Sequence, residues 1–268
     1  MRNALSSSPL IGMSALSCTG ILYSSHRVFF ASLTSRKDQT ESWVVLETVH
    51  AFSSIVCESV RNNHINIALS TSALTMVLKY TSVCVFCAMR LTKRDGDPVF
   101  RFEFNFIDTG NCLVFHDIPV EVLRQECAWS EPLLPDPSVH LILNQSCRRL
   151  PTLIEKLRHM GITEMSVDIT TAGSCADIAL VAESESSRAT LHIKGNNILG
   201  SPDEIESVPP RTQITVTLSG FAFILAKLTM DNNRCMLMAC ESKYLSIWIQ
   251  LPQQYGIVAA VTPAVLVD

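Results

Sequence analysis

The sequence predicts an α+β protein of two similar domains, in which strands outnumber helices. Strand patterns run along the whole chain of 268 residues, whereas only four segments have the periodicity of a helix. The order of these segments also repeats: one strand, one helix and three strands recur four times, with the opening strand absent from the first copy. A chain of this length can hold two domains of about 130 residues each.

Strands are expected in both halves of the chain. Residues 99–107 give the clearest pattern, because four phenylalanines alternate with polar side chains, as expected of a strand with one buried face. Residues 21–33 hold two apolar runs separated at 24–26, which predicts a hairpin. A short strand at 65–69 precedes a helix. In the second half, strands are expected at 139–143, 165–169, 176–181, 189–193, 212–218, 235–239, 244–251 and 257–261.

Four helices are expected. Residues 148–160 give the clearest one, with an apolar stripe of leucine and isoleucine and with Gly161 after the last turn. Pro151 is tolerated only in the first turn, so this helix cannot begin much earlier. The other three helices are expected at 10–17, 71–81 and 220–230.

Composition argues against several classes of protein. Lys and Arg number 21 and Asp and Glu 25, a formal net charge of −4, which argues against nucleic acid bound over the whole surface but leaves room for a local basic stripe. No window reaches about 18 uncharged apolar residues, so no membrane span is expected. The first residues only faintly resemble a signal peptide. The ten cysteines are scattered, which predicts reduced, mostly buried thiols in a cytosolic or nuclear protein.

A Cys-x-x-Cys pair at Cys84 and Cys87 raises the alternative of a small thiol or metal enzyme. A zinc site usually needs a second pair with similar spacing, which the sequence lacks. A thioredoxin-like pair belongs at the start of a helix, whereas this one lies in an expected strand. The sequence also has no phosphate-binding glycine loop and no nucleophile motif. We therefore expect no cofactor, no metal and no enzymatic activity.

Residues 116–143, HDIPVEVLRQECAWSEPLLPDPSVHLIL, resemble the Hus-type (hydroxyurea-sensitive) subunit of the DNA-damage checkpoint clamp. The shared pattern is His-Asp-Ile-Pro, a spacer with a tryptophan, then Glu-Pro, two aliphatic residues and Pro-Asp-Pro. RRLPTLIEKLRHMG at 148–161 is similar to the helix that follows in that family. NHINIALSTSALTMVLKY at 63–80 is similar to the strand and helix of its first domain. The resemblance runs from about residue 19 to 193, and more loosely to the end.

The resemblance implies a two-domain, PCNA-like sliding-clamp fold. Three different subunits would close a ring around DNA, with helices lining the channel and β-sheets outside. We expect a first clamp domain at 1–123, an extended proline-rich interdomain connector at 124–137 and a second clamp domain at 138–268. The family opens with a strand before its first helix, whereas residues 1–8 are polar and short, so the opening strand is expected to be missing here.

The function that the resemblance implies is topological. The chain would be a non-enzymatic subunit of a heterotrimeric checkpoint clamp that encircles double-stranded DNA without reading its sequence. It would assemble with two related clamp subunits, be loaded by a clamp loader, and act as a platform for checkpoint and DNA-repair proteins. A nuclear location is expected, with an additional cytoplasmic pool left open. The nearer alternative is a PCNA-like homotrimeric processivity clamp, which self-association of the purified chain would favour.

The helix at 148–160 carries most of the expected DNA contacts. Four basic residues against one glutamate give it a charge of +3, and its polar face lies opposite the leucine stripe. In a clamp this face would look into the channel and meet phosphates. Without the resemblance, an ordinary solvated face would be the favoured interpretation. With one lysine on each of two other helices, the expected DNA-facing residues are Lys79, Arg148, Arg149, Lys156, Arg158 and Lys227.

Two strand edges and the connector complete the expected contacts. The resemblance implies that subunits join by pairing the last strand of one first domain with an edge strand of the neighbouring second domain, which also removes the aggregation hazard of free edges. The apolar connector residues would either receive client peptides or pack on their own domain. The expected edge residues are Cys112, Leu113, Val114, Phe115, His116, Arg188, Thr190, His192 and Lys194, and the connector residues are Trp129, Leu133 and Leu134.

Overall fold

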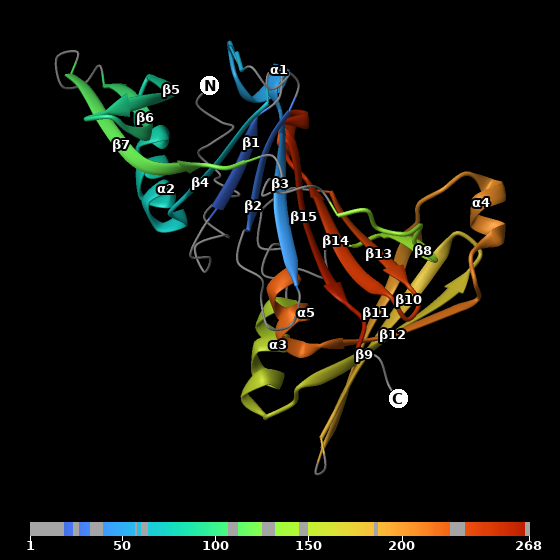
Figure 1. Ribbon diagram of the computed structural model, residues 1–268. Helices are drawn as coiled ribbons and strands as arrows, with labels where there is room; N and C mark the ends of the chain where they lie inside the picture. Colours follow the sequence, from blue (N-terminus) through green and yellow to red (C-terminus); the bar gives the residue numbers. More distant parts are fainter. Residues whose placement is uncertain are drawn as a thin grey trace. The chain divides into compact units, whose positions relative to one another are not determined.

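The computed structural model describes residues 19–23, 27–32, 40–56, 58–59, 64–106, 112–124, 132–144, 150–184, 187–225 and 234–265. The chain divides into two compact units, each of which is visible in Figure 1. Unit 1 comprises Met1–Thr34, Trp43–Glu131 and Leu251–Ile257. Unit 2 comprises Ser35–Ser42, Pro132–Gln250 and Val258–Asp268.

The described strands of unit 1 follow the order β3-β2-β1-β4-β7-β6-β5, and every neighbouring pair is antiparallel. The hairpin expected at 21–33 is confirmed as the β1–β2 pair. The bounds are β1 Thr19–Tyr23, β2 Arg27–Ser32, β3 Glu41–Glu47, β4 Ile65–Leu69, β5 Phe86–Arg94, β6 Asp97–Phe106 and β7 Cys112–Val122. A short helix that was not expected, α1 (Thr48–Ala51), follows β3.

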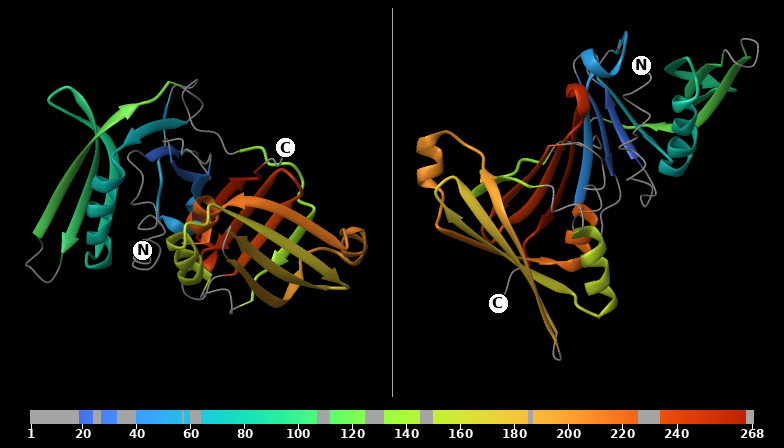
Figure 2. Two further views of the ribbon diagram at one scale, coloured as in Figure 1. Left: turned by 90° about the horizontal axis from the view of Figure 1, so that it is seen from below. Right: turned by 180° about the vertical axis from the view of Figure 1, so that it is seen from behind.

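Helix α2 (Thr71–Leu78) runs along the β5–β6–β7 part of this sheet (Figure 2). The side chain of Ser70 caps it by accepting a hydrogen bond from the backbone of Ala73. The helix continues as a 3₁₀ turn, η2 (Lys79–Ser82), from which Tyr80 stacks on His116 of β7 with ring centres 4.9 Å apart. Phe102 and Phe104 of β6 are fully buried, which confirms the expected alternation.

A tight turn at Asp95 and Gly96 joins β5 to β6. Both residues have positive φ, 54° and 96°, as a type I′ turn requires, and Asp-Gly is a favoured pair for it. This turn sets the register of the hairpin, in which Arg94 is opposite Asp97.

The described strands of unit 2 follow the order β12-β9-β10-β11-β8-β13-β14-β15, and the pairs from β12 to β14 are antiparallel. A 3₁₀ turn, η7 (Pro252–Gln254), precedes β15. The bounds are β8 Val139–Ile142, β9 Glu164–Ala172, β10 Cys175–Glu183, β11 Arg188–Ile198, β12 Arg211–Thr217, β13 Cys235–Cys240, β14 Tyr244–Gln250 and β15 Gly256–Pro263.

Helices α3 (Leu150–His159) and α5 (Leu218–Leu225) lie side by side in unit 2 (Figures 1 and 2). The helix expected at 148–160 is confirmed over 150–159, and Pro151 stands in its first turn. Its apolar stripe is only partly buried, because Leu150 and Ile154 are enclosed whereas Leu153 remains 38% exposed. Helix α4 (Pro202–Ser207) was not expected; Ser201 and Glu204 form its capping box.

The expected repeat of one strand, one helix and three strands occurs three times among the described elements. The copies are β4-α2-β5-β6-β7, β8-α3-β9-β10-β11 and β12-α5-β13-β14-β15. The helix expected at 10–17 lies outside the described residues. Within the part of the chain that the structure describes, no helix is long and apolar enough to cross a membrane.

Candidate nucleic-acid interface and subunit edges

The exposed face of α3 presents the described part of the expected DNA contact. Thr152, Lys156 and His159 are exposed and border a hollow that reaches Ala222 of α5. Arg158 donates a hydrogen bond of 3.0 Å to the carboxylate of Glu155, one turn away. In the described structure, Lys156 has no carboxylate within ion-pair distance. It is therefore the least compensated cation on this helix.

The other expected DNA-facing residues are placed differently or not described. Arg148, Arg149 and Lys227 lie outside the described residues. Lys79 is exposed, but it stands in the 3₁₀ turn after α2 rather than within the helix. A cation at this end is favourable because the helix dipole places partial negative charge there. The presence of a lysine at position 79 is thus explained by stabilisation of the helix end, which the sequence pattern did not reveal.

Hydrogen bonding of β6 determines which backbone groups of β7 point outward. The carbonyl of Asn105 accepts a hydrogen bond of 2.9 Å from the backbone N–H of Val85, the residue directly before β5. The backbone groups of Asn105 therefore face β5. Because backbone groups alternate sides along a strand, the even-numbered residues of β6 face β7. The register then makes the even-numbered residues of β7 bond β6. The backbone N–H and C=O groups of the expected edge residues Cys112, Val114 and His116 therefore bond β6 and are not available to another subunit.

The odd-numbered residues of β7 form its outer edge. β4 pairs with β7 only at 120–122, so it leaves the earlier part of this edge uncovered by any described strand. The backbone groups of Leu113, Phe115 and Asp117 point to this open edge. The side chains of Leu113 and Phe115 are 51% and 49% exposed, so the edge is also apolar.

The outer edge of β11 is defined in the same way. A hydrogen bond of 2.8 Å from the Ser184 backbone to Ser187 makes these two residues a bonded pair. Because backbone groups alternate sides along a strand, the odd-numbered residues of β11 bond β10 and the even-numbered residues point their backbone groups outward. The residues that bond β10 are Ala189, Leu191 and Ile193, and those that point outward are Arg188, Thr190 and His192. β8 covers this edge only at Asn197 and Ile198.

The expected edge residue Lys194 is partly engaged within unit 2. Its carbonyl accepts a hydrogen bond of 2.6 Å from the side-chain amide of Asn144. The neighbouring Gly195 has φ of 70°, where the pairing with β10 becomes irregular. The part of the β11 edge that no described strand covers therefore ends at His192.

The end of the connector is fastened to unit 2. The hydroxyl of Tyr244 donates a hydrogen bond of 2.7 Å to the carbonyl of Pro135. Burial raises the pKa of Tyr244 to about 12, so the hydroxyl keeps the proton that it donates. Leu133 is fully exposed and Leu134 half-buried, whereas Trp129 lies outside the described residues. Tyr244 was not identified from the sequence, although a tyrosine in an apolar strand needs a partner for its hydroxyl.

The thiols are less uniformly buried than expected. Cys84 is buried ahead of β5 and lies 3.7 Å from the carbonyl of Thr81, whereas Cys112 and Cys175 are exposed. Burial, with a smaller effect of Cys84, raises the pKa of Cys87 to about 12. A thiol with so high a pKa is protonated at neutral pH and is a poor nucleophile and metal ligand. Among the described residues, no group of three or more His, Cys, Asp or Glu side chains could hold a metal.

Comparison with known proteins gives a family match over most of the chain. A family model described as Hus1-like protein matches residues 12–207. Checkpoint protein hus1 of Schizosaccharomyces pombe is 23% identical over 229 residues, which cover 79% of this chain and 77% of that protein. Checkpoint protein hus1 homolog of Dictyostelium discoideum is 34% identical over 114 residues, 41% of each chain.

Proposed function

Because the chain belongs to the Hus1-like protein family, we infer that it is a subunit of a heterotrimeric DNA-damage checkpoint clamp with a PCNA-like clamp fold. The observation that carries this conclusion is the family match over residues 12–207. Both relatives are named checkpoint proteins. The resemblance seen at residues 116–143 is thereby confirmed.

In the proposed ring, this subunit joins two related clamp subunits around double-stranded DNA. The arrangement is α+β: α2, α3 and α5 line the channel and the sheets form the outer shell. We also propose that the first clamp domain comprises residues 1–123 and the second residues 138–268, with the connector at 124–137 between them. The exposed cation of Lys156 supports a channel face that meets phosphates without reading bases.

The proposed subunit contacts are the open edges of β7 and β11. Each presents three successive outward-facing residues, Leu113, Phe115 and Asp117 on β7 and Arg188, Thr190 and His192 on β11. Open edges of this length pair with a strand of another chain by main-chain hydrogen bonds. Connector residues Leu133 and Leu134, with Trp129, are proposed to contact client proteins.

The proposed role is that of a scaffold without its own catalytic chemistry. A clamp loader places the ring on DNA, and checkpoint and repair proteins dock on it in the nucleus. The high pKa of Cys87 supports this proposal over a thiol enzyme.

The experiment that tests the function is the mass of the purified chain, alone and after co-expression with candidate clamp subunits from the same source. A chain that is monomeric alone and forms a one-to-one-to-one trimer supports the heterotrimeric clamp. A homotrimer of this chain alone supports the processivity clamp instead. A monomer in every combination contradicts ring assembly.

A further inference from the structure

The two strand edges proposed for subunit contact differ in the side chains that they expose. Beside the outer edge of β7, the side chains of Leu113 and Phe115 are half-exposed. Phe86 of β5 lies in the same row of the sheet as Leu113, because both pair with Asn105 of β6, and it is 50% exposed. Large apolar side chains gathered on a surface in this way are typical of a face that another protein covers.

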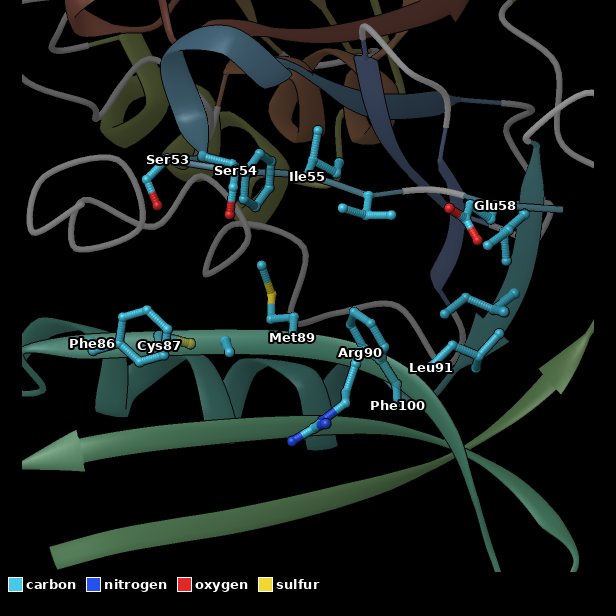
Figure 3. Close-up of a pocket in the computed structure, with 15 residues that line it drawn as sticks. Ser53, Ser54, Ile55, Glu58, Phe86, Cys87, Met89, Arg90, Leu91 and Phe100 are labelled. Atoms are coloured by element: carbon cyan, nitrogen blue, oxygen red, sulfur yellow. The ribbon is translucent and has the colours of Figure 1, made fainter.

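Charged side chains on this face of β5, β6 and β7 are already paired within unit 1. Figure 3, a close-up of the cavity beside β5, shows Arg90 and Met89 extending from opposite faces of this strand. Arg90 forms an ion pair with Glu103 of β6, and Arg101 forms one with Asp117 of β7. These pairs leave no charge for a neighbouring subunit to balance, so the apolar side chains dominate what this face offers.

The other face of the β7 edge also carries apolar groups. Tyr80, in the 3₁₀ turn after α2, stacks on His116 of β7 and is still 39% exposed. Met76 lies one helical turn earlier and is 57% exposed. A strand that pairs with β7 therefore meets apolar side chains on both faces of the sheet.

The exposed face of β11 is polar instead. It carries the side chains of Arg188, Thr190, His192 and Lys194. Among the described residues of β10 and β11, no large apolar side chain is exposed. Glu183 of β10 is opposite Arg188 in the register. Even so, neither Arg188 nor Lys194 has a carboxylate within ion-pair distance in the described structure. Their two positive charges are thus available to a neighbouring surface.

We propose that this chain holds its two neighbours in the ring by contacts of different kinds. The neighbour at β7 covers Leu113 and Phe115 with apolar side chains, and the neighbour at β11 pairs carboxylates with Arg188 and Lys194. This inference rests on the proposed clamp function and adds the chemistry of the two partner surfaces. Salt screens ion pairs at a surface, whereas apolar contact has no charge to screen.

A second copy of this chain fits neither edge well. Residues 112–119 of β7 contain one carboxylate, Asp117, which Arg101 already binds. β11 of a second copy offers Thr190 and His192, and neither is an apolar side chain that could cover Phe115. Two different subunits, one with an apolar strand face and one with an acidic strand face, satisfy both edges.

Salt concentration separates the two contacts. The tagged full chain is co-expressed with each candidate clamp subunit from the same source in turn, and the complexes are washed at roughly 0.1 M and 1 M KCl. We expect one subunit to be retained at both concentrations and the other to be released at the higher one. His192→Pro removes a main-chain donor from the β11 edge and should abolish binding of the salt-sensitive subunit alone.

Two double variants then test the side chains. Arg188→Glu with Lys194→Glu should weaken binding of the salt-sensitive subunit roughly tenfold or more at low salt, and the difference should shrink at high salt. Leu113→Ser with Phe115→Ser should weaken binding of the salt-resistant subunit roughly tenfold or more at both salt concentrations. Each double variant should bind the other subunit normally.

Val122→Ser and Lys243→Glu are the matched controls. Val122 is 51% exposed on β7, but it stands in the part of the strand that pairs with β4. Lys243 lies in a turn of unit 2. Both variants should bind both subunits normally, and circular dichroism checks that every variant is folded.

Equal salt dependence of the two complexes, or loss of the same subunit in both double variants, overturns the proposal and leaves the clamp function in place. Absence of binding to either subunit at low salt contradicts the clamp function and the proposal with it. Self-association of the unmodified chain that Arg188→Glu with Lys194→Glu abolishes would assign the β11 contact to a second copy and overturn the acidic partner.

Discussion

The carboxylate of Asp117 accepts two hydrogen bonds from the guanidinium of Arg101, at 2.6 and 2.8 Å, across the β6–β7 pair. Arg101 also lies 5.7 Å from the ring centre of Phe115, and Arg94 approaches the same carboxylate at 3.5 Å. This ion pair therefore fixes the side chains on one face of the strand whose edge is the proposed subunit contact. A two-pronged pair of this kind is more directional than a single contact.

Replacing Asp117 by asparagine should destabilise the protein in a pH-dependent way. Hydrogen bonds from Arg101 lower the pKa of Asp117, so the folded state favours the ionised carboxylate. Its contribution to the free energy of unfolding is present above the ordinary carboxyl pKa of about 3.9 and is lost as the pH falls through the lower folded value. Thermal unfolding should show a lower midpoint for Asp117→Asn at pH 7, with the difference shrinking below about pH 4. A difference that stays constant down to pH 3 would contradict the ion-pair explanation.

Reversing the charge of Lys156 should weaken retention of DNA by the assembled ring. Each phosphate contact that is lost lowers the salt dependence of binding by roughly one unit of slope. A ring that contains the Lys156→Glu subunit should therefore release DNA at a lower salt concentration than the unmodified ring. Lys243→Glu makes the same charge change in a turn of unit 2 and should leave the release of DNA unchanged. Arg158→Glu should have a smaller effect than Lys156→Glu, because Arg158 is already paired with Glu155. Equal retention of DNA by rings with each of the three variants would contradict the placement of α3 in the channel.

Local patterns predicted the parts of this fold that depend on neighbouring residues. The alternation around Phe102 and Phe104 and the stripe of α3 are local periodicities, and both elements are present. The short helix α4 could also have been found, since Ser201 and Glu204 have capping-box spacing. The Glu155–Arg158 pair was likewise readable, because residues three apart in a helix are neighbours.

The direction of the strand edges could not be read from the sequence. Which residues of β7 face outward follows from the hydrogen bond between Asn105 of β6 and Val85, the residue directly before β5, and both are distant from β7 in the sequence. A change of one residue in that register would exchange Phe115 with His116 at the edge.

Cys87 should be unreactive in the folded protein. Burial raises its pKa to about 12, so almost no thiolate is present at pH 8. Iodoacetamide at pH 8 should modify the exposed Cys112 and Cys175 before Cys87, as peptide mass analysis would show. Replacing both Cys84 and Cys87 by serine should leave ring assembly nearly unchanged. Fast alkylation of Cys87, or loss of a bound metal in the double variant, would instead support the alternative of a small thiol or metal enzyme.

A proline on β11 should block ring assembly only if it removes an outward-facing donor. The N–H of His192 points to the open edge, so His192→Pro removes a hydrogen bond available to the neighbouring subunit and leaves the pairing with β10 intact. The N–H of Leu191, one residue earlier, bonds β10, so Leu191→Pro should instead lower the thermal stability of the isolated chain. The expected result is a folded His192→Pro subunit that fails to form the trimer with its co-expressed partners.

His192→Ala is the matched control, because it removes the imidazole and keeps the N–H. This variant should assemble normally if the contact is made by the main chain. Failure of the alanine variant would place the contact on the side chain, and normal assembly of His192→Pro would exclude the β11 edge. Circular dichroism separates loss of assembly from loss of folding. Because adjacent strand residues face opposite sides, the contrast between positions 191 and 192 tests the edge itself rather than the general tolerance of β11 to proline.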